Sequence, residues 1–547
     1  MASKDLKDIS EIASKLGLSE NEYEKYGNHM AKVSLDVLKR VQKNKRGKLI
    51  LVTAMNPTKE GEGKTTTTIG LGQALNIMGR KVAIAIREPS LGPCFGIKGG
   101  ATGGGKSTVE PSDRINLIFT GDFPAVSAAH NLLSAMINNH IYHGNKMRID
   151  PRKVTFPRTI DMNDRSLRDI IVGSDGSESG VLMKDKFVIT PASEIMAILG
   201  LSSSYSDLKQ RLSRILIGYN FDGKPVYAGD IKAHGAMAAL LRDALKPNLV
   251  QTAEGVPAFV HIGPFGNIAH GTSSIIADRM ALGLAEYLVT EAGFGSELGG
   301  EKFLDMVSRI GKLPVDAVVL VATIRSIKLN AGVSNSKKED VAAVEAGVQN
   351  VLKHVEILRN FGIDPVVAIN RFPTDTDKEI AKLEEMLKKS NVVWSLSEVF
   401  ARGGEGGLDL AGKVMEKLSR QAGDIKQTYE ESDPVRDKII AIAKNVYGAA
   451  EVIFEKKAEN DLKNIEKIGM GKAYVCMAKN QYSLTDDPNV LGWPKDFKIH
   501  VKSISVSSGA GFVVPMLGDI MTMPGLPTEP AANNVDLTDD GIITGLF

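Results

Sequence analysis

A glycine-rich run joins an apolar segment to a helix-patterned one near the start of this chain, and few folds accommodate that arrangement. Residues 48–54 are apolar and β-prone, residues 69–78 are patterned as a helix, and Asn56-Pro-Thr-Lys-Glu-Gly-Glu-Gly-Lys-Thr-Thr-Thr-Thr68 lies between them. A glycine-rich turn from a strand into a helix points backbone N–H groups at the helix N-terminus, where they bind phosphate. The run therefore predicts a nucleotide-binding strand–loop–helix unit.

Individual side chains of this loop have predicted roles. Lys64 is long enough to reach the β- and γ-phosphates of a nucleotide, and the Thr65 hydroxyl can reach Mg²⁺, as in P-loop NTPases. The usual P-loop pattern has glycine where this chain has Thr58, so the match is imperfect. The residues expected to bind ATP and its phosphates are Thr58, Lys59, Glu60, Gly61, Glu62, Gly63, Lys64, Thr65 and Thr66.

A second segment, Gly100-Ala-Thr-Gly-Gly-Gly-Lys-Ser107, matches the P-loop pattern at every position but has the wrong surroundings. Prolines and glycines interrupt the approach to it, and Pro111 follows within a few residues, so neither a preceding strand nor a following helix is expected. We therefore favour the imperfect loop as the phosphate site. The segment 100–107 is expected to be a flexible turn or, as the better interpretation, a loop whose backbone closes over a substrate.

Short runs of Val, Ile and Ala recur along the chain, and each precedes a segment of helical length. Runs that are apolar throughout are typical of strands buried on both faces of a mostly parallel sheet. The fold class predicted is α/β, with a P-loop NTPase-like sheet flanked by helices. Ligands of such sheets bind beyond the carboxyl ends of the strands. The runs are 81–87, 257–262, 287–291, 316–324 and 364–370.

A length of 547 residues exceeds one ordinary core and predicts about two to four domains. We expect the phosphate-binding domain in residues 1–350, a smaller α/β domain in 351–445, and an α+β domain in 446–547. The first 45 residues and the stretch 435–468 are patterned as helices. Further strands are expected at 472–478, 497–506 and 512–516.

Composition excludes several classes of function. The net charge is +2 with dispersed basic residues, so no nucleic-acid-binding surface is expected. Cys94 and Cys476 are far apart, and the nine histidines lack metal-ligand spacing, which argues against disulfides and structural zinc. The charged N-terminus and the lack of a long apolar run predict a cytoplasmic protein without membrane association.

Polar side chains beyond the predicted strands are candidates for chemistry. Arg87 ends the second strand, and because consecutive strands are usually neighbours, it should lie near the phosphate loop and hold a second oxyanion. The alternative is a surface ion pair between Arg87 and Glu88. Asp122 is a candidate ligand for a substrate amine or a metal, and the alternative is an N-cap of the helix that follows it.

Three aromatic residues, Phe294, Phe372 and Phe400, lie in or near loops that contain glycine or proline. Flat rings on loops can sandwich a planar heterocycle. The alternative for each ring taken alone is packing in the core.

Longer stretches of the chain resemble formate–tetrahydrofolate ligases, and the likeness extends along nearly the whole length. It implies a reaction in which formate attacks the γ-phosphate of MgATP to give formyl phosphate, whose formyl carbon is then attacked by N10 of tetrahydrofolate. Monovalent cation dependence (K⁺ or NH₄⁺) and a homotetramer are also implied. The matching stretches include Gly61–Thr68, Arg87–Pro93, Phe95–Gly100, Phe119–Phe123, Asp161–Arg165, Asn267–Gly271, Thr290–Gly295, Gln481–Leu484, Gly518–Pro527 and the terminal Ile543–Phe547.

The resemblance also implies site residues. Lys64 and Thr65 would hold the phosphates with Mg²⁺, and Arg87 would hold formate and then formyl phosphate. Asp122 would accept the amine proton. Folate binding is implied for Glu88, Phe294, Phe372, Pro373 and Phe400, with the domain 351–445 contributing to the folate site.

Several residues depart from the pattern of the family. Phe400 replaces a tryptophan, and Lys106 replaces a tyrosine, so we expect altered folate affinity or folate-tail preference. The other departures are Lys59-Glu60 for a Pro-Ala type pair, Pro124 for His, Thr272 for Cys, and the lack of a cysteine around Ser308-Arg309.

Two alternatives remain open at the level of sequence. The loop 59–66 approaches the K-G-G-x-G-K-T-T loop of partition- and nitrogenase-reductase-type ATPases, in which ATP acts as a conformational switch. A catalytically inactive relative is the other alternative, although Lys64, Thr65 and Arg87 are all retained.

Overall fold

The computed structural model describes residues 6–58, 61–98, 102–419 and 425–546. Its dominant element is a mixed sheet of 12 strands. The path through this sheet runs β1 (Tyr23–Lys25), β2 (Ala31–Val33), β14 (Asn248–Thr252), β15 (Pro257–Val260), β4 (Val82–Ile86), β16 (Tyr287–Glu291), β3 (Lys48–Ala54), β17 (Ala317–Ala322), β18 (Val366–Asn370) and β19 (Val393–Ser397), with β5 (Gly103–Gly104) and β6 (Ser107–Glu110) attached to β14.

The strands from β15 to β19 along this path are all parallel to one another. The strand β14 is antiparallel to β15, to β2 and to β6. The prediction of an α/β fold with a mostly parallel sheet is therefore confirmed. Strands β18 and β19 belong to the same sheet as β3, and the division of the chain into domains at 350 and 445 remains a prediction.

Helices cover both faces of the sheet. The strand β3 shows why: after its first residue it is apolar at every position except Thr53, so the side chains on both of its faces need to be buried. Ile50 and Val52 pack with side chains of α3 (Lys64–Ile77) and α16 (Leu408–Ser419). Leu49 and Leu51 lie in the other core, with side chains of α10 (Ile275–Leu284) and α13 (Val341–Asn360). Alternate side chains of one strand thus serve two cores, as expected for a strand buried on both faces.

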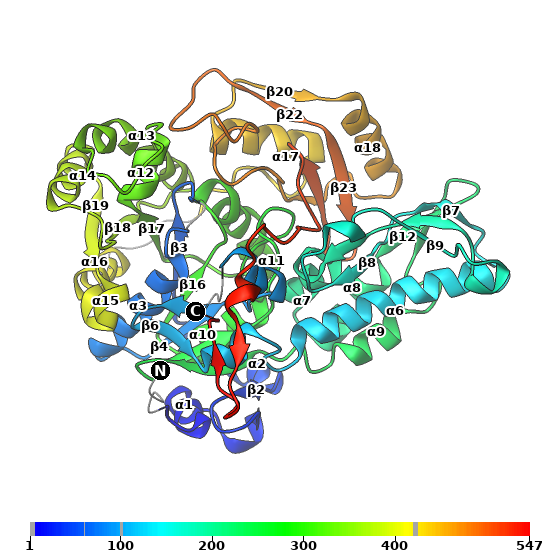
Figure 1. The fold of residues 1–547 in the computed structure, drawn as a ribbon, viewed down its shortest axis with the longest axis horizontal. Coiled ribbons are helices and arrows are strands. Elements are labelled where there is room, and N and C mark those ends of the chain that lie inside the picture. The colour runs from blue at the N-terminus through cyan, green and yellow to red at the C-terminus, as the bar shows by residue number, and fades with distance from the viewer. Residues whose placement is uncertain (1–5, 59–60, 99–101, 420–424, 547) are drawn as a thin grey trace.

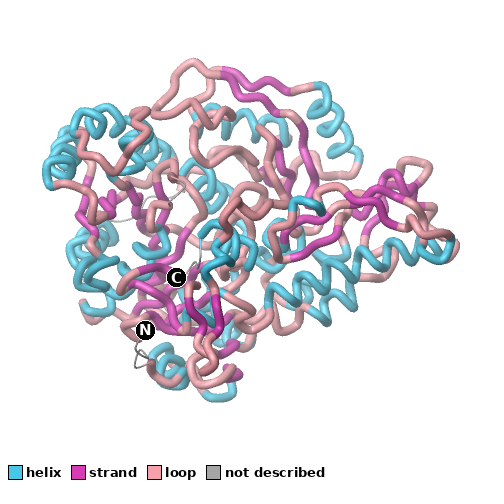
Figure 2. The backbone as a smooth tube through the Cα atoms, viewed as in Figure 1, coloured by secondary structure: helices cyan, strands magenta, loops and turns pink. Residues whose placement is uncertain are grey.

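In Figure 1, β17, β18 and β19 run between two groups of helices. One group contains α12 (Ile324–Asn330), α13 and α14 (Asp377–Lys389), and the other contains α3, α15 (Val399–Arg402) and α16. Figure 2, in the same view, shows strands lying between helices in this part of the molecule. The helix α14 begins with a capping box between Thr376 and Glu379, which satisfies two of the free N–H groups at its start.

Two further lobes flank the sheet, at the right and at the top of Figure 1. The lobe at the right contains α6 (Asp122–Tyr142), α7 (Glu194–Leu201), α8 (Tyr205–Ser213), α9 (His234–Leu240), β7 (Ile149–Val154), β8 (Arg158–Ile160), β9 (Ile170–Val172), β10 (Met183–Asp185), β11 (Phe187–Ile189), β12 (Leu216–Asn220) and β13 (Pro225–Tyr227). The lobe at the top contains α17 (Val435–Ile442), α18 (Lys456–Lys467), β20 (Glu451–Phe454), β21 (Tyr474–Val475), β22 (Lys498–Val501), β23 (Ser503–Ser507) and β24 (Phe512–Met516).

Three predictions about local structure were wrong. The first 45 residues contain the strands β1 and β2 between α1 (Ile9–Leu16) and α2 (Asp36–Val41), because the short β1–β2 hairpin extends the edge of the large sheet. The helical stretch 435–468 is interrupted by β20, which pairs with β22. The single strand expected at 497–506 is two strands, since β22 and β23 pair with different partners.

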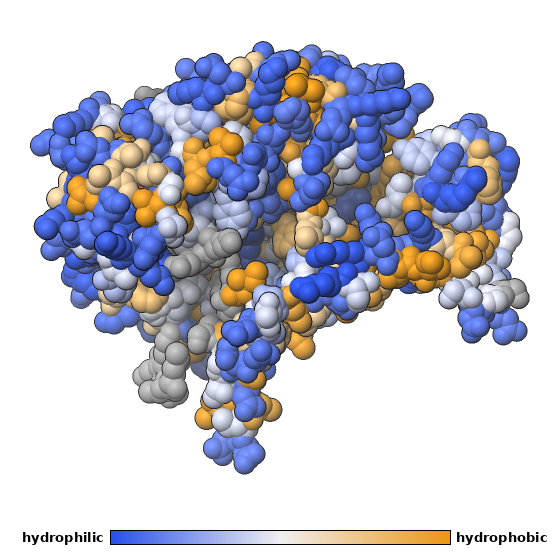
Figure 3. Space-filling view, turned by 45° about the horizontal axis from the view of Figure 1, so that its top comes forward, coloured by the Kyte–Doolittle hydropathy of each residue, from blue (hydrophilic) through white to orange (hydrophobic). Residues whose placement is uncertain are grey.

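Polar side chains cover most of the face seen in Figure 3, and hydrophobic ones form small separate groups. Within the described part of the chain, no helix is both long enough and apolar enough to span a bilayer.

Candidate active site

All candidate residues except Asp122, which begins α6, lie at one edge of the parallel sheet because each follows the carboxyl end of a strand. This is the edge at which ligands of open α/β sheets bind. Arg87 and Glu88 follow β4, Phe294 follows β16, residues 57–66 follow β3, Phe372 and Pro373 follow β18, and Phe400 follows β19.

The glycine-rich loop leads from β3 into α3, which begins at Lys64. Gly63 caps this helix with φ 71° and ψ 29°, a left-handed conformation that glycine adopts without steric cost. The Glu62 carboxylate accepts a hydrogen bond from the Thr58 amide at 2.6 Å, which closes the loop on itself. Thr66 is buried in the first turn of α3, and Lys59 and Glu60 lie outside the described residues.

Neighbouring strand ends hold this loop in place. The Thr323 hydroxyl, directly after β17, donates to the Glu62 carboxylate. The Asn370 amide, at the end of β18, donates to the backbone carbonyl of Glu62 at 3.0 Å. The preference for this loop over the segment 100–107 agrees with the strand and helix on its two sides.

Glu291 connects the loop to Arg87. The Thr65 hydroxyl donates to Glu291 Oε2 at 2.8 Å, and Arg87 Nε lies 4.0 Å from Glu291 Oε1. The expectation that β3 and β4 are neighbours was wrong, because β16 lies between them in the sheet. Arg87 nevertheless lies close to the loop, since β16 supplies the carboxylate that both side chains share.

Thr65 and Glu291 together present a hydroxyl and a carboxylate oxygen beside the phosphate loop. Hard oxygen donors of this kind suit Mg²⁺, which usually takes one or two protein oxygens and completes its shell with water and substrate phosphates. These two residues therefore fit the metal of a bound MgATP. Among the described residues, no group of three or more His, Cys, Asp or Glu side chains is arranged to hold a metal by itself.

Glu88 and Asp122 form a buried acidic pair next to Arg87. Asp122 accepts from Lys32 Nζ at 2.7 Å and from Asn248 Nδ2 at 2.8 Å, and the Lys32–Asp122 pair is buried. Burial raises the pKa of Glu88 well above its usual value, and the negative charge of Asp122 raises it further, against the opposing effect of Lys32. The carboxyl group of Glu88 therefore keeps its proton to higher pH than that of an ordinary glutamate.

Both alternatives considered for these residues were wrong. Asp122 is the first residue of α6, and the N-cap position belongs to Gly121. Glu88 is buried, so it cannot form an exposed ion pair with Arg87.

The aromatic residues line the same edge. Phe294 has a positive φ of 60°, which is uncommon for a bulky residue, and its ring packs so closely over Gly266 that a Cβ there would come within 2.8 Å of it. The Arg325 guanidinium lies 3.7 Å from the centroid of the Phe372 ring. Pro373 is exposed, and Phe400 is 52% exposed.

The segment 102–110 forms a hairpin, in which β5 pairs with β6. Lys106 N donates to the carbonyl of Phe400 at 2.9 Å, and a Cβ at Gly104 would lie 3.0 Å from the Phe400 ring. The hairpin is therefore no P-loop, and its turn lies against one of the predicted folate residues. Gly100 and Ala101 lie outside the described residues, and closure over a substrate remains a prediction.

Comparisons with known proteins identify the family. The sequence profile of formate–tetrahydrofolate ligases matches residues 1–547. The chain belongs to this family. It is 65% identical to the formate–tetrahydrofolate ligase of Thermoplasma volcanium over 544 residues, 66% to that of Thermoplasma acidophilum over 542, and 56% to that of Picrophilus torridus over 541. Each alignment covers 99% of this chain and 100% of the relative.

The chain is similar to ligases of this family over its full length, and this similarity gives no support to the switch-ATPase alternative. Among the departures from the family pattern, Thr272 has a defined place. Its buried hydroxyl donates to the backbone carbonyl of Glu291 at 2.7 Å, which helps to fix the carboxylate shared by Thr65 and Arg87.

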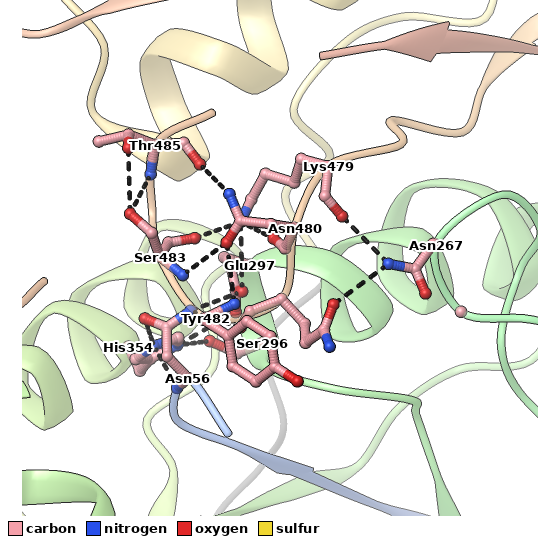
Figure 4. Close-up of polar contacts among 12 residues, drawn as sticks. Asn56, Asn267, Ser296, Glu297, His354, Lys479, Asn480, Tyr482, Ser483 and Thr485 are labelled. Atoms are coloured by element: carbon pink, nitrogen blue, oxygen red, sulfur yellow. Dashed lines mark hydrogen bonds and ion pairs between the residues drawn. The ribbon is translucent and has the colours of Figure 1, made fainter. Parts of the chain in front are cut away.

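Behind the phosphate loop of this ligase-family chain lies a buried polar cluster, drawn in Figure 4. Asn56 lies between β3 and the loop, and its side-chain amide donates to Glu297 Oε1 at 2.9 Å and to the Gln481 carbonyl at 3.2 Å. His354 Nε2 accepts from the Asn56 backbone nitrogen at 3.0 Å, and its Nδ1 bonds Ser296 Oγ at 2.8 Å. The loop is therefore supported by residues from three distant parts of the chain.

The sequence points to Glu291 and Asn370, because both lie at the ends of apolar runs, but it assigns them no role. Thr323 lies at the end of the run 316–324, a usable signal that was missed. Lys32, Asn248 and Glu297 had no such signal, because their partners lie far away in the sequence.

Proposed function

We propose that this chain ligates formate to tetrahydrofolate with the hydrolysis of ATP, giving 10-formyltetrahydrofolate, ADP and phosphate. The observation that carries the proposal is the carboxylate of Glu291, which lies against both Thr65 of the phosphate loop and Arg87. An arginine placed there can hold a carboxylate or an acyl phosphate next to the γ-phosphate of a nucleotide.

The first step is a phosphoryl transfer. An oxygen of formate attacks the γ-phosphorus, the bond from phosphorus to the β–γ bridging oxygen breaks, and formyl phosphate and ADP result. Lys64 and the backbone N–H groups at the start of α3 stabilise the phosphate charge, and Thr65 with Glu291 would hold the magnesium of MgATP, which neutralises charge on the phosphates. We expect this arrangement to act as a P-loop NTPase-like site.

The second step transfers the formyl group. N10 of tetrahydrofolate attacks the formyl carbon, phosphate leaves, and N10 loses its proton. Arg87 holds formyl phosphate in place between the two partners, and Phe294, Phe372, Pro373 and Phe400 would grip the pterin. Asp122, supported by Lys32, would take the proton, and Glu88 would contact the folate.

Several further properties belong to the same proposal. We expect activation by K⁺ or NH₄⁺, a homotetramer and a cytoplasmic location. Both cysteines, Cys94 and Cys476, are free and buried, which suits a reducing compartment.

The deciding experiment mixes the purified protein with MgATP, formate and tetrahydrofolate and follows 10-formyl product after acid conversion to its methenyl form. We expect product and ADP in equal amounts, both dependent on formate. ATP hydrolysis without formyl product would contradict the ligase function and favour an ATPase.

Replacing Arg87 tests the step that depends on it. We expect Arg87→Ala to bind ADP with the affinity of the unaltered protein, because Lys64 and Thr65 remain, while formyl transfer falls at least ~100-fold. Arg87→Lys keeps the charge without the planar fork and should restore little activity. Unchanged turnover in Arg87→Ala would remove this residue from the mechanism.

A further inference from the structure

The buried cluster behind the phosphate loop contains a charge pair that the ligation chemistry does not explain. Glu297 and Lys479 are both fully buried, and Lys479 Nζ lies 3.6 Å from Glu297 Oε1. Glu297 belongs to the π-helical turn Ser296–Gly300 that follows Phe294, whereas Lys479 comes from the loop after β21, in the C-terminal part of the chain. A charge pair costs desolvation energy when buried, so its position calls for an explanation.

The loop that carries Lys479 is docked tightly onto the sheet. The backbone carbonyl of Lys479 accepts from Asn267 Nδ2 at 3.1 Å, and the carbonyl of Gln481 accepts from Asn56 Nδ2 at 3.2 Å. Lys479 Nζ donates to the carbonyls of Asn480, at 2.8 Å, and Ser483. Figure 4 shows the Lys479 side chain lying above Glu297 and pointing toward the carbonyls of its own loop.

Glu297 lies close to the residues that bind phosphate. One of its oxygens accepts from Asn56, which lies just before the loop. Burial raises the pKa of Glu297, while the positive charges of Lys479 and, to a smaller extent, Lys64 lower it. The carboxylate of Glu297 is therefore attracted by the positive charge of Lys64 as well as by that of Lys479.

The imidazole of His354 also lies beside this pair, and the charges of Lys302 and Asp486 act on Lys479 with opposite effects. His354 Nδ1 lies 3.6 Å from Glu297 Oε2, but burial lowers the pKa of His354 to about 3, so its ring is uncharged at neutral pH. Burial likewise lowers the pKa of Lys479, to about 8, despite its partner. The charge that balances Glu297 from this side is therefore that of Lys479.

We propose that Lys479 is a positioning residue for the nucleotide: its ammonium group balances Glu297, so that this carboxylate can anchor Asn56 without drawing Lys64 away from the phosphates. An unbalanced buried carboxylate next to an anion-binding loop repels the phosphates and attracts the lysine that should bind them. The C-terminal part of the chain thereby completes the phosphate site. The inference rests on the proposed function only in requiring that the loop 57–66 binds ATP.

Three variants separate this role from simple packing. Lys479→Met keeps the volume and removes the charge, Glu297→Gln keeps the shape and removes the opposite charge, and the double variant removes both. We expect Lys479→Met to weaken MgADP binding about tenfold or more, and Glu297→Gln to weaken it less than about threefold. The double variant should recover most of the loss, because a neutral amide at position 297 needs no balancing charge.

Lys438→Met is the matched control. Lys438 is also fully buried in the C-terminal part of the chain, and its Nζ donates to the backbone carbonyls of Glu431, Lys472 and Ala473. Its loss should lower stability without changing the affinity for MgADP.

The measurements are calorimetric titration with MgADP and, in the assay, the KM values for ATP and for tetrahydrofolate. We expect Lys479→Met to raise the KM for ATP about tenfold, while the KM for tetrahydrofolate changes less than about threefold. Equal losses in Lys479→Met and the double variant would show that Lys479 acts only by holding its own loop, and would overturn the proposal. If Lys479→Met fails to fold, the double variant must fold and bind MgADP, and its failure overturns the proposal too.

A failure of the proposed function can be distinguished from a failure of the role of Lys479. If the unaltered protein binds MgADP but forms no formyl product, the ligase assignment is wrong and the role of Lys479 is still decided by the titrations. If the unaltered protein forms formyl product and MgADP binds equally well to it and to Lys479→Met, only the role of Lys479 is wrong.

Discussion

At the scale of the residue, burial raises the pKa of several carboxyl groups and so changes the pH at which they become charged. Burial and the negative charge of Asp122 raise the pKa of Glu88 well above its usual value, next to the arginine that would hold formate. Asp278 is a second case, away from the site. It is fully buried in α10, and burial raises its pKa to about 8, since within the described part of the chain neither of its oxygens has a hydrogen-bond partner of normal geometry.

Asp278 makes stability depend on pH. Between the ordinary pKa of 3.8 and about 8, the folded state keeps a proton that the unfolded state has released. The free energy of unfolding therefore falls as pH rises through this window, by about 1.4 kcal/mol per pH unit. We expect Asp278→Asn, which is neutral throughout, to match the unaltered protein at pH 4 and to exceed its melting temperature at pH 8.

The measurement is the difference in melting temperature between the two proteins at pH 4, 6 and 8. A difference that stays constant over this range would show that Asp278 titrates normally in the folded protein.

At the scale of the element, the turn from β3 into α3 depends on one glycine. Gly63 has a left-handed conformation, and a Cβ there would overlap the Asn370 amide that donates to the carbonyl of Glu62. The hydrogen bond from the side-chain amide of Asn370, at the end of β18, therefore stabilises the strand–loop–helix unit. Two segments with P-loop-like sequences therefore fold differently: β5 and β6 form a hairpin, while the loop between β3 and α3 leads directly into the N-terminus of a helix.

Gly63→Ala should displace Asn370 and open the loop. We expect affinity for MgADP to fall at least ~10-fold, because a left-handed alanine costs about 1 kcal/mol and the clash adds to it. Calorimetric titration measures the change.

Gly79→Ala provides the matched control. Gly79 lies beyond the other end of α3 with φ 76°, and a Cβ there meets nothing within 4 Å. This variant should lose a similar amount of stability and keep its affinity for MgADP. Equal weakening in both variants would mean that backbone strain alone, and not contact with Asn370, disturbs the loop.

At the scale of the whole molecule, the proposed phosphate site joins distant parts of the chain. The loop is contacted from β17 through Thr323 and from β18 through Asn370, and Asn56 connects it to the loop that carries Gln481. A ligand that binds the folded site and not the unfolded chain stabilises all of these parts together.

MgATP should therefore raise the melting temperature in proportion to the logarithm of its concentration, with about 2.7 kcal/mol added at about 100 times the dissociation constant. Lys64→Ala should melt within a few degrees of the unaltered protein without ligand and show a much smaller rise with MgATP. Lys43→Ala, at an exposed lysine, is the control and should keep the full rise. The same rise in Lys64→Ala would place the nucleotide elsewhere.

The amino-acid sequence by itself determined the strand–loop–helix unit at 48–78, the run of buried parallel strands, and the position of most candidate residues just beyond those strands. These properties follow from local pattern, since the spacing of apolar residues and glycines acts on a few neighbouring positions. The strands 287–291 and 512–516 coincide with β16 and β24 for that reason.

Only the tertiary structure decided which strands are neighbours and which charges are paired. β16 lies between β3 and β4, so that Glu291 and not direct adjacency brings Arg87 to the loop. Lys32 with Asp122 and Lys479 with Glu297 are partners separated by long stretches of chain. A buried charge depends on what the whole fold packs against it, and no local pattern carries that information.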